Sequence, residues 1–251
     1  MATLPLTAPI GHGKVYKPVY RKLETAPRTV SAATPSYTRS EMASRRYLET
    51  AYREIYTTQL ADLETGESYV IGVTSAVRGE GRTTTALGLA LAIARDLGLR
   101  VLLVELDLQH PVLAQELQVT GVPGLADAAN APELIGSAVR HLEACGVDVL
   151  PAGRAPVAIS RLLRSATLRD LIATARTVYH VIVLDMPPAL SNSDVVPLSG
   201  LTDGVLMVVR SGVTPARLVE QATARFPAGM VKGIILSGQH SKIPNWLRRL
   251  F

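Results

Sequence analysis

One stretch, residues 70–85, constrains the fold of this chain more than any other part of it. An apolar, β-branched run leads into two glycines and then into an alanine- and leucine-rich segment. The order strand, tight loop and helix is the context of a phosphate-binding loop, because backbone N–H groups and the helix N-terminus converge there on an anion. Gly79 and Gly81 let the main chain approach phosphates without Cβ collisions, and the Thr83 hydroxyl is expected to bind the accompanying Mg²⁺.

The loop ends differently from the usual one. It reads Gly81-Arg82-Thr83, where Lys normally follows the last glycine, and Ala76 stands in the place of the first glycine. Arginine keeps the positive charge but is planar and bulkier, so it does not conservatively replace a point charge. An ordinary glycine turn between a buried strand and a helix is the alternative interpretation. We predict nucleotide binding by consecutive residues of the loop and the first helical turn: Gly79, Glu80, Gly81, Arg82, Thr83 and Thr84.

The positive charge of the chain is concentrated at its N-terminus. The net charge is +5, with nine Lys or Arg against four Glu in residues 1–60 and seventeen of each sign in residues 61–251. The remainder is therefore neutral, which argues against a nucleic-acid-binding face on the domain. Residues 1–40 mix Pro, Thr, Ser, Ala and basic residues without periodicity. We predict that they form a disordered basic arm able to touch an acidic partner or anionic lipid.

Apolar strands alternate with helical segments along the rest of the chain. A length of 251 residues with 47% hydrophobic and 19% charged residues suits one α/β domain with a buried sheet. Strands are expected at 68–74, 100–107, 147–150, 181–185, 204–209 and 231–236, and helices at 40–63, 83–96, 112–117, 158–177 and 214–225, with short helices in 118–145. This order predicts a doubly wound, mostly parallel sheet covered on both faces. The domain is placed at 41–240, followed by a basic and apolar tail at 241–251.

Cysteine content and hydropathy indicate the compartment. Cys145 is the single cysteine, so no disulfide framework or cysteine zinc site can form within one chain. No apolar run approaches the ~20 residues that span a bilayer. The N-terminus lacks the apolar segment and the cleavage site of a signal peptide. We therefore expect a cytoplasmic protein.

Three acids stand at the ends of apolar strands. Glu105 and Asp107 end one predicted strand, and Asp185 ends another. The carboxyl ends of strands in an open parallel sheet face the ligand crevice. Beside a phosphate loop, such acids hold Mg²⁺ directly or through water, and one can accept a proton from the attacking nucleophile. Each acid alone could equally cap a helix or face solvent, but three at one sheet edge with a glycine loop favour a metal and nucleotide site.

Four segments of the chain form a set: Gly79 to Thr84, Val101 to Gln109, Leu150 to Gly153 and Val181 to Pro188. In this order they resemble four motifs of the bacterial tyrosine kinases of capsular and exopolysaccharide systems. The first two are the phosphate loop Gly-Glu-Gly-Lys-Ser/Thr-Thr and the second Walker motif Asp-x-Asp-x-Arg. The other two are the Leu-Pro-x-Gly stretch and the Walker B segment Asp-x-Pro-Pro. The similarity runs from about Ser44 to Gly238, most of the chain.

The resemblance implies a deviant P-loop ATPase fold, shared with the ATPases of chromosome partition and division-site placement (the ParA and MinD type). It also implies ATP and Mg²⁺ as cofactors and assigns roles to the candidate residues. Arg82 and the loop amides would hold the phosphates, Thr83 and Asp107 the metal, Asp185 a water of its shell, and Glu105 would be the candidate base. The family further implies a membrane-embedded polysaccharide co-polymerase as activating partner, a peripheral place at the inner face of the plasma membrane, and a homo-oligomeric ring.

The chain departs from the family pattern, so it resembles a degenerate member. Its loop Lys is Arg82, the first Asp of the second Walker motif is Glu105, and the Arg of that motif is Gln109. The glutamate of the ring contact is Arg161, and the tyrosine cluster of the C-terminus is absent.

Two functions remain open at this point. The first is a tyrosine-protein kinase subunit that transfers phosphate from Mg-ATP to tyrosine and regulates polysaccharide synthesis and export. The second is a catalytically inactive subunit that senses nucleotide and regulates the co-polymerase. A partition or positioning ATPase is disfavoured because its signature lysine is Val77 here.

Overall fold

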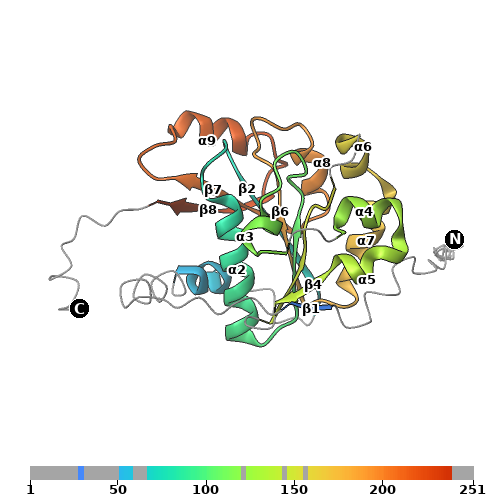
Figure 1. Cartoon of the computed structure of the whole chain (residues 1–251). Coiled ribbons are helices and arrows are strands. Elements are labelled where there is room, and N and C mark those ends of the chain that lie inside the picture. The colour runs from blue at the N-terminus through green and yellow to red at the C-terminus, as the bar shows by residue number, and fades with distance from the viewer. Residues whose placement is uncertain are drawn as a thin grey trace, which may run out of the picture.

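The computed structural model describes residues 28–30, 51–58, 67–119, 123–142, 146–154 and 158–238. The predicted tail at 241–251, and all of the predicted arm at 1–40 except residues 28–30, lie outside the described residues. Within the described parts, the chain is built on an 8-stranded sheet with the order β1-β4-β5-β3-β6-β2-β7-β8. Figure 1 shows the sheet and the helices around it.

The strands are mostly parallel, as predicted. Their bounds are β1 (Arg28–Val30), β2 (Tyr69–Ser75), β3 (Val101–Glu105), β4 (Arg140–Leu142), β5 (Val147–Leu150), β6 (Val181–Asp185), β7 (Gly204–Arg210) and β8 (Val231–Ser237). All neighbouring pairs are parallel except β4 and β5, which form an antiparallel pair. The central strands β2, β3, β6 and β7 are apolar runs, and nearly every side chain in them is buried because helices cover both faces.

Helices lie on both sides of the sheet. They are α2 (Arg82–Leu97), α3 (Leu113–Glu116), α4 (Leu125–Asn130), the 3₁₀ helix η3 (Pro132–Leu134), α5 (Ile135–Ala138), α6 (Ile159–Leu163), α7 (Ala166–Arg176), α8 (Val195–Ser199) and α9 (Ala216–Thr223), and residues 51–58 are also helical. One core lies between the sheet and α2, with residues 51–58 beside it. The second core lies on the opposite face, under α4, α5, α7 and α8.

Helix 51–58 packs across α2. The ring of Tyr52 lies against Gly88 so closely that a Cβ on that glycine would stand 2.3 Å from the ring. Beside this contact, Arg53 Nε and Tyr56 Oη both donate to Asp96 Oδ2, at 2.8 and 2.9 Å. Burial of the Tyr52 ring raises the pKa of its hydroxyl. The segment that precedes the domain is thus fixed to the helix that starts at the phosphate loop.

The structure corrects the predicted helix at 158–177. The segment contains two helices, α6 and α7, separated at Ser165. Ser165 is extended, with ψ of 155°, and its hydroxyl accepts a hydrogen bond from Leu168 N at 3.1 Å, so it caps a new helix instead of continuing the first. Strand β4 falls where short helices were expected, and β1 falls within the arm that was predicted to be disordered.

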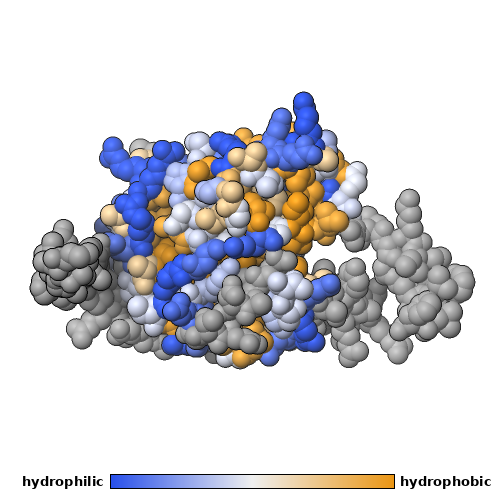
Figure 2. Space-filling model, turned by 180° about the vertical axis from the view of Figure 1, so that it is seen from behind, coloured by the Kyte–Doolittle hydropathy of each residue, from blue (hydrophilic) through white to orange (hydrophobic). Residues whose placement is uncertain are grey.

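Helix lengths and surface character bear on membrane contact. Among the described residues, no helix is long and apolar enough to cross a bilayer. Figure 2 shows the back of the molecule, where apolar side chains appear in patches among polar ones. The exposed apolar side chains include Ile234 and Leu236 of the edge strand β8.

Candidate functional site

The predicted phosphate loop joins β2 to α2, at the carboxyl edge of the sheet. Its two glycines, Gly79 and Gly81, have φ of 79° and 83°, a conformation that glycine adopts without strain. Gly81 is the residue before α2, and within the described part of the chain no side chain caps this helix. The first amide groups of α2 therefore remain open to an anion, as a nucleotide phosphate would require.

The side chain of Glu80 is turned into the protein and fixes the loop from within. It is 2% exposed. Its Oε2 accepts a hydrogen bond from Val77 N at 2.8 Å, and its Oε1 accepts from Arg210 N at 3.2 Å and from the Thr214 hydroxyl. The Ser237 hydroxyl donates to the Glu80 carbonyl. Glu80 thus ties the loop to the ends of β7 and β8, and only its backbone is available to a ligand.

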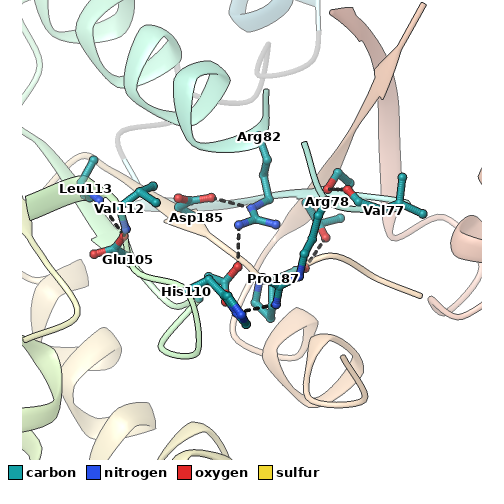
Figure 3. A network of polar contacts seen from close by, with 12 residues as sticks. Val77, Arg78, Arg82, Glu105, His110, Val112, Leu113, Asp185 and Pro187 are labelled. Atoms are coloured by element: carbon teal, nitrogen blue, oxygen red, sulfur yellow. Dashed lines mark hydrogen bonds and ion pairs between the residues drawn. The ribbon is translucent and has the colours of Figure 1, made fainter. Parts of the chain in front are cut away.

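Arg82 occupies the centre of the site. Its Nη2 lies 2.7 Å from Asp107 Oδ2, and its Nε lies 3.0 Å from Asp185 Oδ1. The side chain of Arg82 is 11% exposed, and those of the two acids are 3% and 1% exposed. Figure 3 shows the Arg82 guanidinium beside the Asp185 carboxylate. A cation at the loop-lysine position therefore neutralises both strand-end acids at once.

Each of these two acids keeps one oxygen without a partner. Asp107 Oδ1 and Asp185 Oδ2 are buried and accept no hydrogen bond in the described structure. A buried carboxylate oxygen left unpaired is costly, and it is the kind of ligand that Mg²⁺ prefers. Among the described residues no cluster of three or more His, Cys, Asp or Glu could hold a metal. Two acids suffice for Mg²⁺ beside a nucleotide, because this ion keeps waters and takes phosphate oxygens, so the donor set fits it.

Burial changes the acidity of Asp185. It raises the pKa of this carboxyl from 3.8 to about 6, against the lowering effects of Arg82 and of the Thr83 hydroxyl. The charge of Glu105, whose Cα pairs with that of Asp185 across β3 and β6, adds a smaller upward effect. Thr83 is half-buried at the start of α2, and its hydroxyl is near enough to Asp185 to affect the pKa of that carboxyl.

Glu105 is not part of this group. Its Oε1 accepts hydrogen bonds from Val112 N at 2.6 Å and Leu113 N at 2.7 Å, and its Oε2 accepts from Ala152 N at 3.0 Å. Both oxygens are therefore committed to backbone amides at the start of α3 and after β5. The structure brings together Arg82, Asp107, Asp185 and Thr83, while the candidate base fixes neighbouring loops. Thr84 is exposed, and its carbonyl accepts a hydrogen bond from the Tyr52 hydroxyl at 3.4 Å.

Two residues beside the site, Arg78 and His110, were not predicted. Arg78 Nη2 lies 2.5 Å from His110 Nδ1, and this contact bridges the phosphate loop and the loop after β3. A basic residue inside the loop sequence and a histidine three positions after Asp107 were the available signals. Arg161, at the predicted ring contact, lies exposed on α6.

Comparison with known proteins places the fold among P-loop ATPases. The AAA domain family matches residues 68–214. Tyrosine-protein kinase YwqD of Bacillus subtilis is 31% identical over 66% of this chain and 71% of its own length. The solved kinase domain of VpsO is 30% identical, with a TM-score of 0.69 over 79% of this chain and 99% of that domain. The septum site-determining protein MinD of Pyrococcus horikoshii, solved with Mg-ADP, is 21% identical, with a TM-score of 0.55 over 71% of this chain and 75% of that one, and the likeness concerns the fold alone.

Proposed function

Because the chain belongs to the bacterial tyrosine kinases, a family built on the AAA domain of P-loop ATPases, we propose that it binds Mg-ATP at the loop 79–84 and transfers phosphate to tyrosine in capsular or exopolysaccharide synthesis. The observation that carries the proposal is the meeting of the loop with two buried acids, each of which has an unpaired oxygen. This is the arrangement a phosphoryl-transfer site needs, since such catalysis rests on positioning and charge neutralisation.

The proposed roles follow the geometry. The loop amides and the first turn of α2 bind phosphate oxygens, and Thr83 with Asp107 and Asp185 hold Mg²⁺. Mg²⁺, when bound, neutralises charge on the phosphates. Arg82 supplies a positive counter-charge to both acids. Glu105 keeps the start of α3 and the loop after β5 in place.

A second function, a catalytically inactive nucleotide-sensing subunit, is favoured by one specific observation. The Arg82 guanidinium already contacts one oxygen of each acid, so a metal that uses these acids must share them with a cation. Like charges in a buried site repel, and this lowers metal affinity unless Arg82 moves. Slow or absent turnover with retained nucleotide binding would be the result.

One experiment separates the two functions. Purified protein is incubated with Mg-ATP and a cytoplasmic fragment of the membrane co-polymerase, and phosphotyrosine is mapped by mass spectrometry. Asp185→Asn serves as the matched negative control because it removes one of the two acids. Phosphotyrosine that depends on Asp185 supports the kinase. Nucleotide binding without phosphotyrosine, with or without the fragment, supports the sensor.

The partners of the protein are part of the proposal. We place the chain beside the plasma membrane, bound to a membrane-embedded co-polymerase as a separate chain, and we expect it to form a homo-oligomer. Family membership supports both statements. Arg161, exposed on α6 where the family carries a glutamate, indicates that the contact between subunits differs from the family's ring.

A further inference from the structure

Arg78 lies in the phosphate loop and forms no ion pair with another described residue. It is exposed, and its Nη2 lies 2.5 Å from His110 Nδ1. In the described part of the chain no carboxylate lies within ion-pair distance of Arg78. His110 Nδ1 is itself 4.0 Å from Asp107 Oδ1, the unpaired oxygen of that acid. A guanidinium that donates to an imidazole nitrogen gains a hydrogen bond but no compensating charge.

Arg82, in contrast to Arg78, is paired with carboxylates. Its guanidinium is buried and is bonded to both Asp107 and Asp185, so its charge is already balanced. Pulling it toward a phosphate would leave two buried carboxylates without a counter-ion, which is costly. The loop therefore holds two arginines, and only one of them is free to meet a new anion without breaking an existing ion pair.

We propose that Arg78, and not Arg82, is the side chain that contacts the terminal phosphates of the bound nucleotide. This inference rests on the proposed function and assigns the phosphate-binding charge of that same site. Arg78 directly precedes Gly79, and its side chain reaches His110 on the loop that begins at Asp107 (Figure 3). A planar guanidinium at this place can form paired hydrogen bonds with phosphate oxygens.

His110 is the positioning residue for this contact. Its backbone N–H donates to the Asp107 carbonyl at 3.2 Å, so His110 belongs to a turn that starts at Asp107. The exposed ring, with 56% of its side chain accessible, holds the Arg78 side chain beside the loop that begins at Asp107. When phosphate binds, Arg78 exchanges an imidazole nitrogen for phosphate oxygens that carry negative charge, so an ion pair is added to the hydrogen bond.

The test compares nucleotide binding by four proteins: wild type, Arg78→Ala, Arg78→Lys and Arg100→Ala. Arg100 is the matched control because it is exposed and precedes β3, at the opposite end of the sheet from the loop. Isothermal titration calorimetry is run with Mg-ADP, with AMP, and with a non-hydrolysable ATP analogue plus Mg²⁺. Thermal unfolding of each variant confirms that the exposed substitutions leave the fold intact.

The expected result is a Kd for Mg-ADP and for the ATP analogue that rises about tenfold or more in Arg78→Ala, as for loss of a charged hydrogen bond. AMP affinity stays the same, Arg78→Lys falls between, and Arg100→Ala matches wild type. A Kd in Arg78→Ala equal to that of wild type overturns this inference and leaves the proposed function standing. Failure of the wild type to bind any nucleotide overturns both.

Discussion

The Nε atom of Arg82 lies 3.0 Å from Oδ1 of Asp185, at the position where a phosphate loop usually carries a lysine. The same guanidinium reaches Asp107 with its Nη2. A lysine carries all three of its N–H donors on one nitrogen, so it cannot reach two carboxylates from two separate nitrogens in this way. The charge of the loop cation is therefore already balanced by the two strand-end acids.

We expect Arg82→Lys to increase phosphate release or phosphotyrosine yield from Mg-ATP. The compact ammonium frees carboxylate oxygens for the metal and can reach between the phosphates. An increase of about tenfold, equivalent to about 1.4 kcal/mol of barrier, would be a modest outcome. The measurement is steady-state phosphate release with the partner fragment present, and Arg100→Lys is the control. If phosphate release by Arg82→Lys stays at background, low activity does not come from Arg82, and the nucleotide-sensing function is favoured.

We expect Thr83→Ala to weaken Mg-ADP binding. Thr83 is the second residue of α2 and lies beside Asp185. Its hydroxyl oxygen is the uncharged ligand that we propose for Mg²⁺. Loss of one such ligand should raise the Kd by about tenfold in calorimetry. Thr177→Ala, an exposed threonine after α7, is the matched control. Equal Mg-ADP affinities for the two variants would show that the Thr83 hydroxyl does not bind the metal.

Glu105→Gln should lower stability more than it lowers function. The carboxylate accepts three backbone hydrogen bonds, and the neutral amide presents an NH₂ group toward N–H donors. We expect a loss of about 1–3 kcal/mol in urea unfolding, with Mg-ADP affinity unchanged. Glu116→Gln, exposed on α3, is the control. A stable variant that has lost turnover by about a hundredfold or more would instead show that Glu105 acts as the base.

Asp185 should make the unfolding free energy depend on acid pH. Its pKa is 3.8 ordinarily and about 6 in the folded chain. Between these values the folded state holds a proton that the unfolded state has lost, so this group's contribution to stability is greatest below about pH 4 and falls until about pH 6.

Comparison with Asp185→Asn isolates this effect, because other carboxylates such as Asp96 and Asp127 have lowered pKa values and act in the opposite direction. The difference between the unfolding free energies of wild type and variant should change by about 1–3 kcal/mol from pH 4 to pH 6.5. A constant difference over this range would contradict the raised pKa.

The family, the fold class and the order of the main elements could be predicted from the sequence. The predictions succeeded where the chain is locally consistent, as in β2, α2 and β6, where apolar runs, glycines and strand-end acids point to the same structure. They failed at Ser165, because a serine inside an apolar helical periodicity gives no sign that its hydroxyl will cap a new helix. Strand β4 was missed because three residues, Arg140–Leu142, are too few to show alternation.

The site could be located from the sequence, but its contacts could not be assigned. The pattern of strand-end acids predicted that Glu105, Asp107 and Asp185 lie at one edge of the sheet beside the glycine loop. It could not show that Glu105 turns toward backbone amides, because those amides belong to residues brought near only by tertiary structure. The same holds for Arg78, whose partner His110 is thirty-two residues away on another loop.

The contacts of Glu80 have a consequence for how the protein is made. The loop conformation depends on Thr214 and on Ser237, which follow Glu80 in the chain by 134 and 157 residues. A ribosome builds the chain from its N-terminus, so the loop exists as sequence long before its supporting partners leave the exit tunnel. Nucleotide-binding competence should therefore appear abruptly and late in synthesis, once β8 has been released, and nascent chains that stop before β8 should not be retained on immobilised nucleotide.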